Sequence, residues 1–296
     1  MRNGMNIQHL QEWVGRTEIR SDQVTAAPMA ALAATLDIES PYPQPGDPLP
    51  PLWHWLYFLP FPRQSELGPD GHAKRGGFLP PVELPRRMWA GGRTRFHHPL
   101  RVGESITRTS RIVDVKFREG RSGALVFVLV RHEISNAGGI ALTEEHDIVY
   151  RDHPRPGDLP SSPRIAPEGI APEGRADAAW ERVVKPDDVL LFRYSALTFN
   201  GHRIHYDRRY ATEVEGYPGL VVHGPLIATL LIDLVRSNLP AAVVTRFEFR
   251  ALSPIFDTAA FSVSGKPDSE GKTVRLWAKD PTGATATTAM AHLSEY

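Results

Sequence analysis

One segment of the chain, PLIATLLIDLV at residues 225–235, limits the possible folds more than any other. Placed on a helix, it is apolar on nearly every side, and such a helix is stable only when other elements bury most of its surface. Pro225 suits the first helical position, where its missing N–H costs nothing, and Gly224 suits the cap before it. The segment therefore predicts a central helix enclosed by the rest of the fold.

Runs of strand-forming residues are available to enclose this helix. Three runs precede it, at residues 105–116, 124–135 and 141–150. Four runs follow it, at residues 243–252, 259–266, 273–280 and 285–296. The apolar run VLLFRYSALT at 189–198 is interpreted as a further strand, and the alanine-rich stretch 24–36 as a helix. A buried helix wrapped by an antiparallel sheet is the outline of a hot-dog fold, and both halves show a similar order of signals. We therefore predict an α+β chain with two such units, a double hot dog in which each sheet wraps a central helix.

A proline-rich stretch without clear periodicity, HPRPGDLPSSPRIAPEGIAPEG, divides the chain. It predicts a linker at residues 153–178 between an N-terminal unit, 1–152, and a C-terminal unit, 179–296. A weak internal repeat supports this division, since GRTRFHHPLRVGES at 92–105 resembles VTRFEFRALSPIFDTA at 244–259. Both copies carry Thr-Arg-Phe, then a proline, then an acidic residue, at the same place in their half.

The composition excludes several classes of function. The 34 basic and 34 acidic residues balance, whereas a nucleic-acid groove needs a basic excess. The chain has no cysteine, which excludes disulfides and thiolate chemistry. No apolar run reaches the roughly 18 residues of a membrane-spanning helix, and MRNGMNIQHLQEW has no apolar signal core. We expect a cytoplasmic protein that acts on a small molecule, as a monomer or a homodimer.

The stretch TFNGHRIHYD, residues 198–207, gathers polar side chains into a short loop. Three interpretations are open: a catalytic loop, a metal site and a polar turn. A metal site would use His202, His205 and His223. Only His202 and His205 have a spacing, i and i+3, that suits zinc, and no third ligand is specified, so we expect no metal. The catalytic interpretation gains support from the predicted buried helix that starts shortly after it at His223-Gly224-Pro225. A histidine is a natural proton carrier near neutral pH, and a helix N-terminus offers an N–H donor to a developing oxyanion.

Two neighbouring motifs resemble a known family. YSALTFNGHRIH at 194–205, followed by VHGPL at 222–226, resembles the hydratase motif of MaoC-like enoyl-CoA hydratases and dehydratases. The variant is similar to the subgroup of mesaconyl-C4-CoA hydratase and itaconyl-CoA hydratase, whose N-terminal half resembles the dehydratase region of fungal fatty-acid synthase. FLPPVELPRRMWAGG at 78–92 is also similar to that subgroup. The resemblance is strong over 192–237, moderate over 78–150 and weak before residue 70.

The resemblance implies a double hot-dog hydro-lyase that hydrates or dehydrates a short 2-enoyl-CoA, here a C5 dicarboxylyl-CoA such as itaconyl-CoA or mesaconyl-C4-CoA. His205 matches the catalytic histidine, and Gly224 matches the glycine whose amide polarises the thioester carbonyl. Asn200 falls where the common motif has an aspartate. Because an amide does not titrate, Asn200 can position water or the imidazole but cannot transfer a proton.

Supporting roles are expected for three residues of the same region: His202, His223 and Tyr194. The division of roles between His202 and His205 stays open. No cofactor is expected, since coenzyme A is part of the substrate. The N-terminal unit has no counterpart of the Asn-x-His-x-x-His loop, so it is interpreted as a degenerate hot dog that shapes the acyl pocket and part of the coenzyme A site.

Arginines are the candidate groups for binding coenzyme A phosphates or a substrate carboxylate. The candidates are Arg86, Arg87, Arg93 and Arg250, and solvated or ion-paired arginines are the equally plausible alternative. Two rival functions remain. One is acyl-CoA thioester hydrolysis, which usually needs an acid on the central helix, where Asp233 lies well past the N-terminus. The other is a non-catalytic acyl-CoA-binding module.

Overall fold

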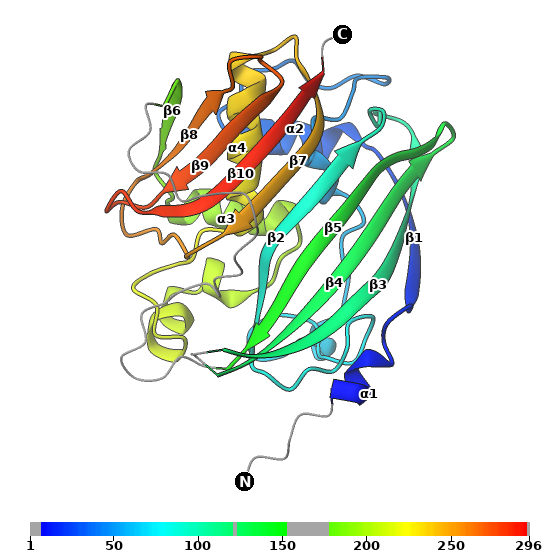
Figure 1. Ribbon diagram of the computed structural model, residues 1–296, viewed down its shortest axis with the longest axis vertical. Helices are drawn as coiled ribbons and strands as arrows, with labels where there is room; N and C mark the ends of the chain where they lie inside the picture. Colours follow the sequence, from blue (N-terminus) through cyan, green and yellow to red (C-terminus); the bar gives the residue numbers. More distant parts are fainter. Residues whose placement is uncertain (1–6, 121–122, 153–177, 295–296) are drawn as a thin grey trace.

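The computed structural model describes residues 7–120, 123–152 and 178–294 (Figure 1). Ten strands form one antiparallel sheet in the order β1-β3-β4-β5-β2-β7-β10-β9-β8-β6. The strands are β1 (Thr17–Gln23), β2 (Arg86–Phe96), β3 (Ser105–Gly120), β4 (Gly123–Asn136), β5 (Gly139–Arg151), β6 (Trp180–Val184), β7 (Val243–Ala251), β8 (Phe261–Pro267), β9 (Thr273–Lys279) and β10 (Thr285–Ser294). All seven strand-forming runs predicted around the central helix are strands in the structure.

Within the described ranges, four α-helices accompany the sheet: α1 (Ile7–Gln11), α2 (Ala26–Thr35), α3 (Asp188–Leu197) and α4 (Gly224–Asn238). Shorter turns are 3-10 helical at Trp53–Leu56, Gln64–Glu66 and Arg203–His205, and π-helical at Tyr210–Val214. None of these helices is both long and apolar enough to cross a membrane, across the ranges that the structure describes.

The predicted central helix is α4. Every side chain from 226 to 235 is buried, and strands β6 to β10 of the C-terminal half curve around the helix (Figure 1). The cap differs by one residue from the prediction, because His223 is the N-cap and Gly224 is the first helical residue, followed by Pro225. Gly224 therefore presents its N–H as one of the first donors of the helix, which have no partner within it.

The two halves meet where β2 pairs with β7. Read outward from this seam, the strand order is the same on both sides, β2-β5-β4-β3-β1 and β7-β10-β9-β8-β6. Arg95 lies opposite Arg246 at the seam, and these are the central residues of the two Thr-Arg-Phe matches in the predicted repeat. The two symmetric halves of this sheet form the predicted double hot dog.

The helix predicted at 24–36 is α2 of the N-terminal half; it is shorter than α4, and its buried residues are Met29, Leu32 and Ala33. The segment between α2 and β2 has only short 3-10 turns among its described residues, and it adds Leu52, Trp53 and Leu56 to the core. The predicted linker at 153–178 falls almost wholly on residues 153–177, which lie outside the described residues.

The run VLLFRYSALT is a helix, α3, and its interpretation as a strand was wrong. Asp187 caps the helix by accepting a hydrogen bond from the Leu190 N–H at 2.8 Å. The buried side chains of α3 are Leu191, Tyr194 and Ser195, which have the i, i+3, i+4 spacing of one helical face. The short strand β6 takes the edge position in the sheet instead.

Candidate active site

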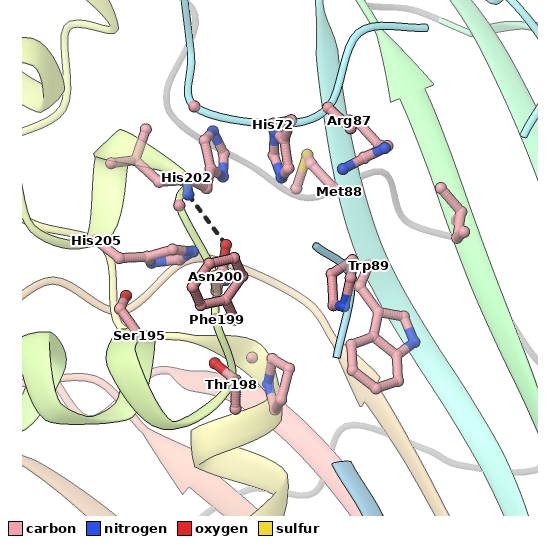
Figure 2. Close-up of a pocket in the computed structure, with 18 of the residues that line it drawn as sticks. His72, Arg87, Met88, Trp89, Ser195, Thr198, Phe199, Asn200, His202 and His205 are labelled. Carbon is pink, nitrogen blue, oxygen red and sulfur yellow. Dashed lines mark hydrogen bonds between the residues drawn. The ribbon is translucent and has the colours of Figure 1, made fainter. Parts of the chain in front are cut away.

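A cavity of about 1200 Å³ lies between the two halves of the molecule. From the C-terminal half it is lined by the end of α3, the TFNGHRIHYD loop and the start of α4; from the N-terminal half it is lined by residues 57–80 and by β2. Figure 2 shows Asn200, His202 and His205 on one side of this space and Arg87, Met88 and Trp89 of β2 on the other. The predicted catalytic loop therefore faces a wall built by the other half of the chain.

His205 presents one unoccupied nitrogen to this cavity. Its Nδ1 lies 2.7 Å from the carbonyl oxygen of Val221, and because a carbonyl only accepts, Nδ1 carries the hydrogen and Nε2 carries the lone pair. The imidazole is buried, and burial lowers its pKa to about 4, although the bond to Val221 acts in the opposite direction. At neutral pH His205 is therefore an uncharged base of fixed tautomer.

Asn200 is held by a turn of its own backbone. It follows the end of α3, and its side-chain oxygen accepts a hydrogen bond from the His202 N–H at 3.0 Å, as an Asx turn does (Figure 2). Val221 fixes the tautomer of His205, so Asn200 is not needed for that task, and its second lone pair and its NH₂ group can still bond to a ligand or a water molecule. The side chain of His202 takes no part in this turn and faces the cavity.

His223 supports His205 from beneath. The two rings stack with centroids 3.8 Å apart and planes 18° apart, and His223 shares a 2.8 Å hydrogen bond with the Ser195 hydroxyl. His223 is fully buried, and burial followed by the neighbouring His205 lowers its pKa well below the usual range. Tyr194 packs against the His223 ring, with ring centroids 5.0 Å apart. Tyr194 and His223 therefore form a packed layer behind His205, and their supporting role stays a prediction.

Gly224 places a bare peptide N–H at the edge of the cavity. It lines the cavity, and a Cβ built on it would meet no atom within 4 Å. Packing within the protein therefore does not require a glycine at this position. The open space leaves room for a ligand to approach the helix N-terminus, where partial positive charge favours an oxyanion.

The N-terminal half contributes a hydrogen-bonded pair that sequence reasoning missed. His72 Nδ1 donates to the Asp70 carboxylate at 2.9 Å, and the His72 ring lies 4.0 Å from the ring of His202. Burial, then the charge of Arg87, lower the pKa of His72, while Asp70 opposes the shift. GPDGHA at residues 68–73 offers only a turn signal, so no motif announces that it contacts a loop some 130 residues later.

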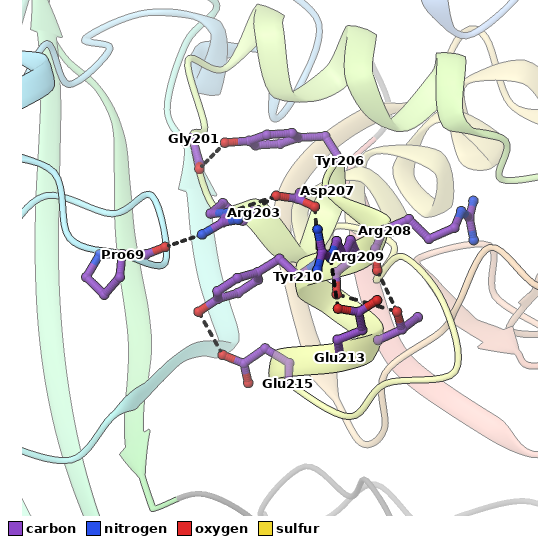
Figure 3. A network of polar contacts seen from close by, with 11 residues as sticks. Pro69, Gly201, Arg203, Tyr206, Asp207, Arg208, Arg209, Tyr210, Glu213 and Glu215 are labelled. Carbon is purple, nitrogen blue, oxygen red and sulfur yellow. Dashed lines mark hydrogen bonds and ion pairs between the residues drawn. The ribbon is translucent and has the colours of Figure 1, made fainter.

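Close backbone contact holds these two loops together. A Cβ on Gly71 would fall 1.8 Å from the Gly201 carbonyl oxygen, so the backbones touch directly. The Arg203 N–H donates to the Asp70 carbonyl at 2.9 Å, and the Arg203 guanidinium reaches the Pro69 carbonyl at 3.0 Å (Figure 3). The position of His72 beside His202 is therefore fixed by the backbone.

The three histidines of the metal alternative, His202, His205 and His223, do not converge on one point. The rings of His205 and His223 lie face to face, and His205 Nδ1 donates a hydrogen bond to the Val221 carbonyl, so it is not available to a metal ion. In the described part of the chain, a different set, Asp70, His72 and His202, has its ligand atoms within 4.8 Å of one another. The first two members of this set already satisfy each other by a hydrogen bond.

The four predicted anion-binding arginines divide sharply. Arg86 is almost buried and pairs with the Glu215 carboxylate at 2.7 Å, which joins the two halves. Arg93 pairs with two carboxylates of β5 and does not line the cavity, and Arg250 does not line it either. Arg87 lines the cavity beside His72 (Figure 2).

Comparison with known proteins agrees with this geometry. Residues 52–257 match the family of hydroxyacyl-thioester dehydratase type 2. The chain is 48% identical over 281 residues to the mesaconyl-C(4)-CoA hydratase of Chloroflexus aurantiacus, covering 95% of this chain and 96% of that protein. It is 29% identical over 274 residues to the mitochondrial hydroxyacyl-thioester dehydratase type 2 of Schizosaccharomyces pombe, covering 80% and 86%.

Solved structures share the fold at low sequence identity. A MaoC-like dehydratase from Phytophthora capsici has a TM-score of 0.65 at 13% identity, covering 99% of this chain and all of the other. A Mycobacterium tuberculosis protein described as a double hot dog has a TM-score of 0.56 at 15% identity, covering 96% of both chains. The predicted fold and the MaoC-like resemblance are thereby confirmed. The chain is a hydro-lyase and belongs to the hydroxyacyl-thioester dehydratase type 2 family.

Proposed function

We propose that this hydro-lyase adds water across the C2=C3 bond of a short 2-enoyl-CoA that carries a free carboxylate, and catalyses the reverse dehydration. The observation that carries the proposal is the pairing, in one cavity, of a neutral imidazole nitrogen on His205 with the helix-terminal N–H of Gly224. The choice of substrate is supported by the relative of 48% identity, which is a mesaconyl-C(4)-CoA hydratase. Itaconyl-CoA, which the family resemblance also suggests, has the same carbon skeleton, but its double bond joins C3 to a methylene carbon, so the steps below are written for mesaconyl-C4-CoA.

The groups present suffice for each step of hydration. His205 Nε2 takes a proton from water as the water oxygen bonds to C3, and the electron pair of the double bond moves onto the thioester oxygen. The Gly224 N–H stabilises the resulting enolate, an effect on the order of 3 kcal/mol for one such donor. The imidazolium of His205 then returns a proton to C2, and the neutral base is regenerated.

Asn200 and His202 have supporting places in this scheme. Asn200, held by its own turn, positions the water without competing for the proton. The ring of His202 lies edge-on to His205 at 5.4 Å, and burial, then the neighbouring His72 and His205, lower its pKa well below the usual range. We propose that His202 acts as an uncharged polar wall of the water site and leaves proton transfer to His205.

The thioesterase alternative fits the site less well. Its acid on the central helix would be Asp233, which is buried, pairs with Arg236 at 3.1 Å and with Arg182 at 3.4 Å, and does not line the cavity. A carboxylate placed in this way cannot attack a thioester in the cavity. The non-catalytic binding module gains no support from the free lone pair of His205, which plain binding does not require.

A substrate panel tests the proposal. The protein is incubated with crotonyl-CoA, 3-methylcrotonyl-CoA and mesaconyl-C4-CoA, and products are followed by mass spectrometry and by loss of enoyl absorbance. Addition of 18 mass units to the intact thioester is expected, fastest with the carboxylated substrate. Release of free coenzyme A would point to hydrolysis, and binding without any product would point to the module; either result overturns the proposal.

A further inference from the structure

Arg87 is a cationic side chain at the cavity wall. In the described parts of the chain no carboxylate lies within ion-pair distance of its guanidinium, although its charge acts on the pKa of the nearby Asp70 carboxylate and on that of the Tyr150 hydroxyl, its neighbour across β2 and β5. Three of the predicted anion-binding arginines lie on β2. The other two, Arg86 and Arg93, each form an ion pair with at least one carboxylate. Arg87 is thus the member of this set whose charge remains available to a ligand.

The free charge sits next to the reacting groups. Arg87 and His72 lie side by side at the rim of the space that separates β2 from His202 and His205 (Figure 2). The His72 ring lies 4.0 Å from the His202 ring, which lies 5.4 Å from the His205 ring. An anion bound by Arg87 would therefore be held close to the carbon that receives water.

The groups around Arg87 leave room for an anion from outside. The Asp70 carboxylate feels the charge of Arg87, but its hydrogen bonds go to the side chain and the N–H of His72, at 2.9 and 3.1 Å. Burial keeps the pKa of His72 and of His202 below the usual value, so these rings are neutral and do not pair with the guanidinium. The contact between Gly71 and Gly201 fixes the loops that carry these rings.

We propose that Arg87 binds the free carboxylate of the substrate, and that this carboxylate is attached to C3, the carbon that receives the hydroxyl. The inference rests on the proposed function and adds a residue and a position to it. A carboxylate on C3 lies one bond from the reacting carbon, which matches the closeness of Arg87 to the histidines. A planar guanidinium can hold such a carboxylate by two parallel hydrogen bonds and so fix which face of the double bond meets the water.

A matched pair of substrates tests the role of Arg87. Mesaconyl-C4-CoA and 3-methylcrotonyl-CoA have the same branched skeleton, and the first has a carboxylate where the second has a methyl group. For Arg87→Met we expect kcat/KM for mesaconyl-C4-CoA to fall by about 100-fold, the usual loss when one partner of a desolvated charge pair is removed. The value for 3-methylcrotonyl-CoA should change less than about threefold, or rise. Arg87→Lys, which keeps the charge but loses the planar fork, should recover only part of the loss.

Two control variants separate this site from its neighbours. Arg93→Met, on the same strand but outside the cavity, should leave the ratio of the two kcat/KM values unchanged. Arg108 is another cavity-lining arginine without a carboxylate within ion-pair distance in the described chain; it lies on β3 over the Phe58 ring, and Arg108→Met should also leave the ratio unchanged.

Three outcomes overturn the inference. An equal loss on both substrates would assign Arg87 to the coenzyme A portion that they share. A collapsed ratio in Arg108→Met with an unchanged ratio in Arg87→Met would move the carboxylate site to β3. An unchanged ratio in a folded Arg87→Met, checked by urea unfolding, with Arg87→Lys equally active, would remove its role. If the wild-type protein hydrates neither substrate, the proposed function itself fails, which is a separate result.

Discussion

At the scale of single residues, the site depends on one imidazole whose two nitrogens have different tasks. His205 Nδ1 is committed to Val221, and Nε2 is left for the substrate side. We expect His205→Gln to lower kcat by at least about 100-fold, because a positioned general base contributes roughly that much or more. The change is checked by steady-state kinetics on the preferred enoyl-CoA. His9→Gln, at an exposed position of α1, should keep full activity; a loss of less than tenfold in His205→Gln would contradict the assignment of the base.

Replacing the amide of Asn200 by a carboxylate should change how activity depends on pH. The base works only when neutral, so activity is lost as the pH falls through the pKa of His205, which is about 4. In Asn200→Asp the side-chain oxygen can still accept from the His202 N–H, but the new negative charge favours imidazolium. The acid limb of kcat/KM should therefore move upward by about one pH unit or more. In a profile from pH 4.5 to 8, with unfolding monitored at each pH, the wild type should keep nearly constant activity, whereas Asn200→Asp should lose activity at the acid end. A variant profile as flat as that of the wild type would argue against close coupling of the two side chains.

At the residue scale, local signals were enough to select residues that the fold brings together, while their catalytic roles stay predictions. Asn200, His205 and Gly224 stand in one motif and one helix start, and the fold brings all three to one cavity. Arg87 could not be separated from Arg86 by sequence, because both line the cavity and they differ only in their ion-pair partner: Arg86 has Glu215, whereas Arg87 has none in the described chain. The cap was misplaced by one residue, since proline and glycine preferences do not distinguish the last non-helical residue from the first helical one.

At the scale of elements, the site depends on two loops that meet through glycines. Gly71 has a left-handed backbone, with φ of 88°, and its Cα faces the Gly201 carbonyl. Gly71→Ala should separate the loops, move His72 away from His202 and lower kcat/KM by about tenfold or more, because small misplacements in a preorganised site are costly. The measurement is kinetics combined with urea unfolding.

Gly46 provides the matched control for this change. It also has a left-handed backbone, with φ of 89°, but a Cβ there meets nothing within 4 Å. Gly46→Ala should therefore cost only the intrinsic strain of about 1–2 kcal/mol and leave activity unchanged. Equal effects of the two substitutions would show that backbone strain, rather than contact between the loops, explains the loss.

Elements were predicted correctly from the sequence where their pattern was strong and long, and wrongly where it was short. The helix α4 was visible because its apolar character exceeds what any strand of a two-faced sheet would carry. The helix α3 was mistaken for a strand because its apolar residues are contiguous, and short apolar runs do not reveal their period. The helix α2 was predicted close to its observed bounds because its stretch is rich in alanine, the strongest helix former.

At the scale of the whole molecule, buried histidines make the fold sensitive to acid. Burial lowers the pKa of His72, His132, His202, His205 and His223 below the ordinary value of 6.5. As the pH falls below about 6.5, these side chains bind protons in the unfolded chain but not in the folded one, so the free energy of unfolding falls. Each histidine that stays neutral contributes a slope of up to about 1.4 kcal/mol per pH unit.

We therefore expect several kcal/mol of stability to be lost between pH 7 and pH 5. Urea unfolding at pH 7.5, 6.0 and 5.0 measures this loss. His132→Gln, which removes one buried imidazole outside the cavity, should make the dependence less steep. A free energy of unfolding that is constant from pH 7.5 to 5.0 would contradict the neutral state of these rings in the folded protein.

The touching backbones of Gly71 and Gly201 also bear on how such a chain can change over generations. A side chain introduced at either position pushes against the other loop, and a lengthened loop on one side needs a matching change on the other. The two halves have matching strand orders, but at this contact a substitution in one half affects the other. Selection at this point acts on the pair of loops as one unit, although they lie far apart in the coding sequence.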